Sequence, residues 1–199
     1  SLISGSSAVN AQSSVIKPLE VYQQFKQIEH LNTPKNKQAF NDTLEIIDDA
    51  TFENLRAPFY AYAAKLSVND GNWPRGQKLL DKALKRLNNT NDSNLMVDTL
   101  DYISWVYFNR GDYATANYYV QKIADYGFTA DKKRAQAIAL NRLAISYLEL
   151  GFNKLAMEPL QSALKLSRST KDTNTEFLSL LYLINARIEH PDSDPKSTL

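Results

Sequence analysis

The chain has 199 residues, a formal net charge of +1 and no cysteine. The near-neutral charge excludes a polyanion-binding protein, which needs clustered Lys and Arg. The lack of cysteine excludes disulfides, zinc thiolate sites and cysteine nucleophiles. Six glycines and seven prolines are too few for a turn-rich β fold. No apolar run reaches the roughly 20 residues of a membrane span, so we expect neither nucleic-acid binding nor membrane insertion.

The N-terminal segment is rich in small residues and has no helical period. Val9, Asn10 and Ala11, followed by Gln12, fit the small-x-Ala cleavage pattern of a secretory signal peptide. We interpret residues 1–16 as a signal-peptide remnant, with a disordered terminus or a cloning remnant as the alternative. On the first interpretation the protein is periplasmic or otherwise exported, and on the second it is cytoplasmic.

A 40-residue repeat dominates the rest of the chain. Gly71, Gly111 and Gly151 lie 40 residues apart, and their neighbours recur with them. Small residues stand seven places before each glycine and large apolar residues nine places after it. These matched positions are Ala64, Ser104 and Ala144, followed by Leu80, Val120 and Leu160. Such a period is typical of a stack of helical repeats.

Each repeat predicts a hairpin of two antiparallel helices. Apolar residues step by three and four on both sides of the glycine, which indicates two amphipathic helices. The glycine ends the first helix, because it enters the left-handed conformation without penalty. Asp112 or Asn153 is expected to cap the second helix. The small residues Ala116 and Ala156, like those before the glycines, predict a close approach of the two backbones.

The predicted helices follow in chain order. They are 18–30 paired with 36–48, 54–69 with 74–88, 94–109 with 113–126, 132–150 with 154–168, and a single helix 174–189. The first pair fits the register poorly: Phe40 and Ile47 fall on its columns, but Leu31 replaces the glycine. A divergent first repeat is expected of a cap. Pro159 is expected to kink its helix or to delay its start. Residues 17–190 thus form one repeat domain and 191–199 a linker.

These residues resemble the tetratricopeptide repeat superfamily. The pattern of this superfamily has small and aromatic residues on the first helix, a glycine, and an alanine on the second helix. The matching residues here are Ser104, Tyr107, Gly111, Tyr113, Ala116 and Val120, and again Ala144, Tyr147, Gly151 and Ala156. The 40-residue period is similar to a longer variant in bacterial sensor and regulator proteins. The resemblance implies an all-α, right-handed superhelix of about four helix pairs plus a final helix, with first helices lining its concave side.

The repeat register predicts which side chains face that concave side. A peptide or protein segment is the partner that such a face implies. The predicted binding residues are Phe25, Lys65, Asp98, Asp101, Trp105, Phe108, Asn141, Arg142, Ile145, Leu148 and Asn185. Some tetratricopeptide domains grip a terminal carboxylate with Lys, Asn and Arg. Here Asp101, Trp105 and Ile145 occupy those positions, so a carboxylate clamp is not expected.

Trp105 and Phe108 make their helix apolar around most of its circumference. A helix with two apolar faces needs two packing partners, and one of them is its own hairpin. The second is a bound peptide or ligand on the functional interpretation. The alternatives are the first helices of neighbouring repeats, a second copy in a homodimer, or a helix outside this chain.

Catalytic and metal-binding patterns are missing from the sequence. His30 and His190 lie far apart near helix ends, the acidic pairs lack metal-ligand spacing, and no glycine loop could cradle a phosphate. We therefore expect a non-enzymatic region without cofactor or metal. The resemblance favours the extracytoplasmic sensor region of a bacterial signalling protein of the diguanylate cyclase or histidine kinase type, with a catalytic domain after residue 199.

Two alternative functions stay open at this stage. One is a structural adaptor in a cell-envelope assembly, which would hold two proteins together without a small ligand. The other is a cytosolic peptide-responsive regulator, which would need a DNA-binding helix-turn-helix before residue 18. No such motif is visible in the chain.

Overall fold

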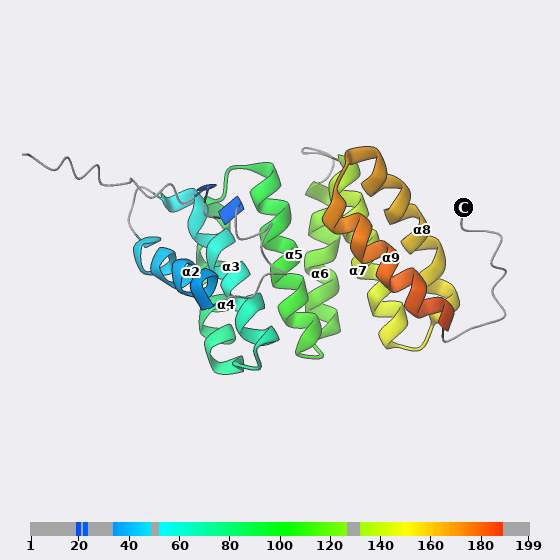
Figure 1. Ribbon diagram of the computed structural model, residues 1–199, viewed down its shortest axis with the longest axis horizontal. Coiled ribbons are helices and arrows are strands. Elements are labelled where there is room, and N and C mark those ends of the chain that lie inside the picture. The colour runs from blue at the N-terminus through cyan, green and yellow to red at the C-terminus, as the bar shows by residue number, and fades with distance from the viewer. Residues whose placement is uncertain (1–18, 21, 24–33, 49–51, 127–131, 189–199) are drawn as a thin grey trace, which may run out of the picture. The chain divides into compact units, whose positions relative to one another are not determined.

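The computed structural model describes residues 19–20, 22–23, 34–48, 52–126 and 132–188 (Figure 1). These residues are all-α and include no strand, as the sequence predicts. The chain divides into two compact units, residues 1–47 and residues 48–199. The described residues of the first unit include a 13-residue helix, and those of the second form a series of packed helix pairs.

In the first unit, α2 (Pro34–Ile46) matches the predicted helix 36–48. Phe40 and Thr43 lie one turn apart on this helix and are buried, as is Ile47 just beyond its end. The predicted partner helix, 18–30, lies largely outside the described residues, and so do Phe25 and Leu31.

The described residues of the second unit form three helical hairpins followed by a single helix. Its helices are α3 (Glu53–Asn69), α4 (Trp73–Arg86), the short 3₁₀ helix η2 (Leu87–Asn89), α5 (Ser93–Asn109), α6 (Tyr113–Tyr126), α7 (Lys132–Glu149), α8 (Asn153–Thr170) and α9 (Thr173–Ile188). Consecutive helices run antiparallel and pack as pairs: α3 with α4, α5 with α6, and α7 with α8 (Figure 1). The predicted helix bounds in this unit agree to within two residues.

The three glycines end their helices as predicted. Gly71, Gly111 and Gly151 have φ values of +77°, +80° and +76°, in the left-handed region. At the second turn Gly111 N donates to Phe108 O at 2.9 Å, and Asp112 N donates to Tyr107 O at 3.0 Å. The other two turns repeat both hydrogen bonds. This bond pair satisfies the last carbonyls of the first helix and reverses the chain.

The predicted caps are half right. Asp112 Oδ1 accepts a hydrogen bond from Thr115 N at 3.1 Å, which confirms Asp112 as the cap of α6. The predicted cap Asn153 is wrong, because Asn153 is already the first residue of α8 and Phe152 occupies the cap position without a side-chain bond. The cap stands one residue after the glycine in each turn, and in the third turn that residue is a phenylalanine. Of the two effects expected from Pro159, the delayed start is wrong, since α8 begins well before it, and the kink stays a prediction.

Small residues bring the two helices of each hairpin together. Ala64, Ser104 and Ala144 are at most 1% exposed. They have small counterparts on the second helices in Gly76, Ala116 and Ala156, all buried. At Gly76 an added Cβ would lie only 2.8 Å from Val68 Cγ2. The close backbone approach that these columns predict is therefore present in all three hairpins.

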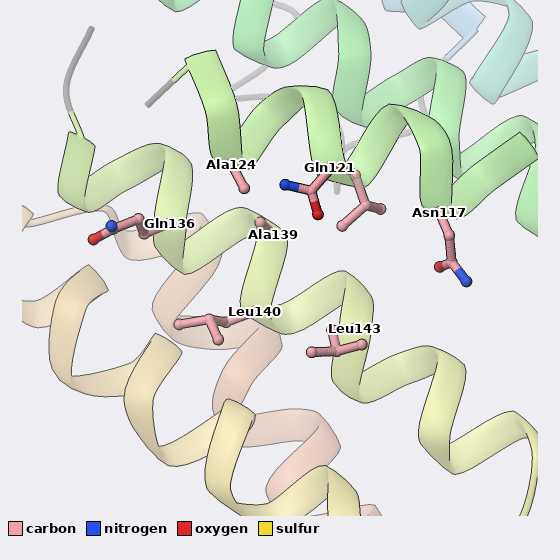
Figure 2. A pocket seen from close by; sticks show the side chains of 8 residues that line it. Asn117, Gln121, Ala124, Gln136, Ala139, Leu140 and Leu143 are labelled. Atoms are coloured by element: carbon pink, nitrogen blue, oxygen red, sulfur yellow. The ribbon is translucent and has the colours of Figure 1, made fainter. Parts of the chain in front are cut away.

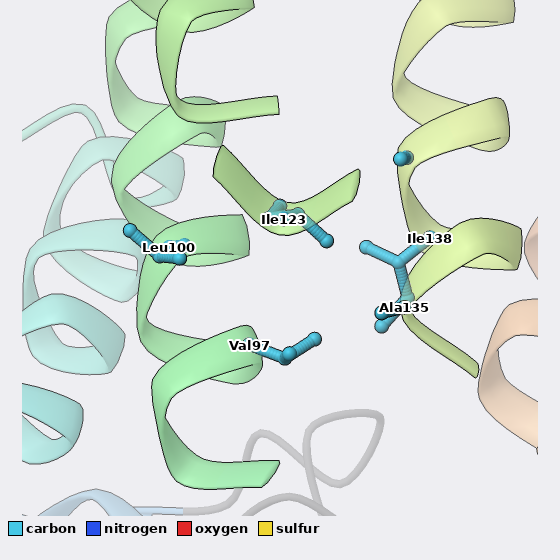
Figure 3. Packing of buried hydrophobic residues seen from close by; sticks show 6 residues of the cluster. Val97, Leu100, Ile123, Ala135 and Ile138 are labelled. Carbon is cyan, nitrogen blue, oxygen red and sulfur yellow. The ribbon is translucent and has the colours of Figure 1, made fainter. Parts of the chain in front are cut away.

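Apolar clusters continue from one hairpin into the next. One cluster joins the second hairpin to the third: Val97 and Leu100 from α5, Ile123 from α6, and Ala135, Ile138 and Ala139 from α7 (Figure 3). Another joins α7 and α8 to α9 through Ala144, Ala156, Leu160, Leu164 and Leu183. The core of this unit is thus distributed between successive layers, as expected of a repeat protein.

The turn between α8 and α9 has the same backbone conformation without a glycine. Lys171 has φ +56°, and Asp172 N donates to Ser167 O at 3.0 Å, the counterpart of the bond from Asp112 to Tyr107. An L-residue with a side chain in this region costs about 1 kcal/mol. Lys171 is exposed, so the side chain brings no buried contact that would offset this cost.

We predict that Lys171→Gly raises the free energy of unfolding by about 1 kcal/mol, whereas Gly111→Ala lowers it by about the same amount. An added Cβ at Gly111 meets no atom within 4 Å, so its cost comes from the backbone alone. Urea denaturation followed by circular dichroism measures both changes. A destabilised Lys171→Gly variant would contradict the assignment of this turn.

Candidate functional site

Most of the predicted binding residues lie on the first helices α3, α5, α7 and α9. The structure pairs several of them across neighbouring helices. Arg142 on α7 makes a bidentate ion pair with Asp101 on α5: Nε lies 2.5 Å from Oδ1 and Nη2 lies 3.0 Å from Oδ2. The side chains of Arg142 and Asp101 are only 10% and 17% exposed. A bidentate pair of this kind fixes geometry as well as charge.

Trp105 lies beneath this ion pair and links three helices. The guanidinium carbon of Arg142 lies 4.7 Å from the centroid of the Trp105 ring, within cation–π distance. On the other side, Trp105 Nε1 donates to Asn69 Oδ1 on α3 at 3.2 Å. Its ring also stacks on Phe108 at a centroid distance of 6.1 Å. The neighbouring first helices therefore supply a second set of partners for Trp105.

A second ionic cluster joins α5, α7 and the start of α9. Asp98 is buried and binds Arg134 Nη2, while Arg134 Nε lies 3.5 Å from Asp172 Oδ2. Burial of Arg134 opposes its charge, but the carboxylates of Asp98 and Asp172 outweigh burial and raise its pKa. Asp172 also caps α9 by accepting a hydrogen bond from Thr175 N at 3.2 Å. This cluster therefore fixes where α9 begins.

Asn141 is buried and bonded to α9. Its Nδ2 donates to Thr175 O at 3.2 Å, and its Oδ1 accepts from Ser179 Oγ at 2.9 Å. Tyr182, on the same helix, has a pKa raised chiefly by burial, with Arg142 acting in the opposite direction. At the other end of the unit, Lys65 Nζ lies 5.3 Å from the centroid of the Tyr102 ring.

The remaining predicted residues differ in exposure. Ile145 is buried, Leu148 is half-buried against the cluster that joins α7 to α9, and Asn185 is exposed. Phe108 is half-buried and meets the Tyr113 ring edge-on at 5.3 Å. Phe25 lies outside the described residues. As a ligand-binding set these residues stay a prediction, but Asp98, Asp101, Asn141 and Arg142 bind other parts of the chain.

A groove of about 620 Å³ opens between α6 and α7 (Figure 2). Aliphatic side chains from both helices line it, and three amide side chains accompany them. The lining residues are Asn117, Val120, Gln121 and Ala124 from α6, and Gln136, Ala139, Leu140 and Leu143 from α7. None of the eight carries a charge. A concave, mostly apolar surface with a few polar groups is the usual form of a binding site.

The groove interrupts the regular burial of the repeat. Leu143 corresponds to Ala63 and Ile103 in the earlier repeats, which are 2% and 0% exposed, whereas Leu143 is 37% exposed. Leu100 is 3% exposed, but its counterpart Leu140 is only partly buried. The α7 face at this point thus lacks the cover that the α5 face has.

The amides of the groove have unused hydrogen-bonding capacity. Gln121 Nε2 donates to Asp125 Oδ1 at 3.0 Å within α6. Asn117 and Gln136 make no side-chain hydrogen bond to any residue that the structure describes. An amide offers both donors and an acceptor, so these groups suit the peptide groups of a bound chain.

Sequence reasoning missed this groove. Leu143 falls on a column whose other members are buried, so its position in the repeat indicates a core residue. The one available signal was on α6, where uncharged amides stand at Asn117 and Gln121, two positions one turn apart on one helix face. That signal is weak in a single sequence.

The described part of the chain offers no metal site and no membrane span. It contains no group of three or more His, Cys, Asp and Glu side chains that could hold an ion. None of its helices has the length and hydropathy needed to cross a bilayer. His30 and His190 both lie outside the described residues.

Comparison with known proteins finds no match: no family model, no curated protein and no solved structure is similar to the chain. The resemblance to tetratricopeptide repeats therefore rests on the residues themselves.

We predict that Trp105→Ala lowers the free energy of unfolding by about 3 kcal/mol, because the ring contacts α3, α7 and Phe108. Tyr118→Ala is the control: this aromatic residue is 56% exposed, and its loss should cost less than about 1 kcal/mol. Urea denaturation measures both. Equal, small losses would show that Trp105 is a surface residue without a packing role.

Proposed function

We propose that the second unit is a non-enzymatic recognition module that binds a peptide or protein segment in the groove between α6 and α7. The observation that carries this proposal is the uncovered aliphatic floor of the groove, with Leu143 37% exposed beside amides that have unused hydrogen-bonding capacity. The first-helix face is the weaker candidate, because its charged groups are already paired with one another.

The groove indicates the chemistry of the bound segment. Its lining is uncharged, so burial of a charged side chain there would leave that charge without a partner at a cost of several kcal/mol. Aliphatic side chains would instead cover Leu140 and Leu143, and peptide groups would pair with Asn117 and Gln136. A volume of about 620 Å³ suits a few residues of an uncharged, aliphatic segment.

We further propose that this module is the extracytoplasmic sensor region of a bacterial signalling protein. Support comes from the resemblance to tetratricopeptide repeats and from the cleavage pattern at Val9, Asn10 and Ala11. The second candidate is a structural adaptor in a cell-envelope assembly, which the exposed Leu150, Phe152 and Leu155 of the third hairpin favour. A membrane helix and a catalytic domain in the reading frame after Leu199 would favour the sensor, and a stop codon there the adaptor.

We predict that capped, uncharged aliphatic peptides bind this chain and that Leu143→Glu weakens their binding at least tenfold. A carboxylate at this position would have to lose water when the groove is filled. Leu155→Glu on α8 is the matched control, because Leu155 is 57% exposed and does not line the groove. Isothermal titration calorimetry against a set of such peptides measures the affinities.

Two results would overturn the groove as the binding site. One is that no peptide of the set saturates the protein. The other is that both glutamate variants weaken binding equally, which would place the ligand elsewhere.

A further inference from the structure

The final helix, α9, carries a stripe of large apolar side chains that are exposed to solvent. Phe177 is 53% exposed, Leu181 40%, Ile184 55% and Ile188 72%. The opposite face of α9, with Thr175, Ser179, Leu183 and Ala186, is buried. We call the four exposed residues the α9 stripe.

The corresponding positions are covered in the earlier repeats. Forty residues before Leu181 and Ile184 stand Asn141, which is 3% exposed, and Ala144, which is 0% exposed. In the repeat before that, Ser104 is 1% exposed. The cover comes from the helices that follow: Ala144 packs against α8, and Asn141 bonds to α9. Among the described residues no helix follows α9 to cover the stripe.

The side chains of the α9 stripe suit a different kind of partner from the earlier hairpins. Ala64, Ser104 and Ala144 allow a second helix to approach closely, but the same column carries Ile184 in α9. The bulk of Ile184 keeps a facing helix at the distance where side chains interdigitate. The stripe is therefore built for packing of large side chains between two helices.

The spacing of the stripe is self-complementary. Its intervals are four, three and four residues, which read the same in both directions. In an antiparallel pair of such helices, Phe177 faces Ile188 of the second copy, and Leu181 faces its Ile184. This is the condition for a two-fold interface, in which the same patch serves both subunits. The 4-3-4 spacing is also that of a coiled-coil seam.

Charge does not oppose this association. The α9 stripe contains no charged residue, and the chain has a formal net charge of only +1. Two copies therefore approach each other with little electrostatic repulsion, and proteins with net charge near zero associate readily.

We propose that a second copy of this chain covers the α9 stripe, with the two α9 helices packed antiparallel across a two-fold axis. Four partly exposed side chains form an apolar patch of a few hundred Å², and two such patches bury an area at the low end of specific interfaces. The dimer is accordingly weak, with a dissociation constant in the micromolar range. The stripe is separate from the α6/α7 groove, so this proposal does not depend on the proposed ligand.

Sedimentation velocity on the full chain between about 1 µM and about 1 mM tests the dimer, since a micromolar constant falls inside this range. We expect a concentration-dependent shift from monomer to dimer, and at least a tenfold weaker dimer for Ile184→Glu. Leu155→Glu is the control, because Leu155 is as exposed as Ile184 but lies on α8. A wild-type chain that stays monomeric throughout would overturn the proposal, as would equal loss of dimer in both variants.

A second experiment tests the antiparallel orientation without disturbing the fold. Because the chain has no cysteine, Leu181→Cys and Ile184→Cys each introduce a single thiol. When the two variants are mixed and oxidised, the disulfide between positions 181 and 184 should form several times faster than a disulfide between two copies of the same variant. Faster linkage of Ile184→Cys to itself would indicate parallel helices and contradict the proposed interface.

Discussion

The bidentate ion pair between Asp101 on α5 and Arg142 on α7 is the contact on which the arrangement of the second and third hairpins depends. Both side chains are nearly buried, so loss of either one would leave the other charge desolvated and without its partner. The pair holds the Arg142 guanidinium over Trp105, and Trp105 in turn bonds to Asn69 on α3. The ion pair and Trp105 together link three successive first helices.

Other polar side chains join the first helices of the second unit in the same way, and this pairing explains where binding surfaces remain. Arg134 with Asp98, and Asn141 with Ser179, join successive first helices through polar side chains that are then no longer available to a ligand. Among the described residues, uncovered apolar surface includes the α6/α7 groove and the stripe on the last helix. A functional account of this chain therefore rests on those two surfaces rather than on the charged face that the repeat register emphasises.

The sequence predicts the hairpins well because their determinants are local and repeated. Gly71, Gly111 and Gly151 end helices because the turns need a left-handed backbone conformation, which glycine adopts whatever its neighbours are. Ala144 and Ala156 mark the close packing of two helices. The cross-helix pairs were not predictable in this way. Arg142 falls in a column with Tyr62 and Tyr102, so nothing in the repeat indicates that it meets Asp101. The exposure of Leu143 could not be predicted either. It depends on the spacing between hairpins, which the residues at one repeat position do not determine.

A double-mutant cycle on Asp101→Asn and Arg142→Met tests most directly that buried pairs join the first helices. Each single change leaves one desolvated group without its partner and should cost about 3 kcal/mol of unfolding free energy. The double variant should lose much less than the sum, with a coupling energy of about 2 kcal/mol. Additive losses, with a coupling below about 0.5 kcal/mol, would contradict the account.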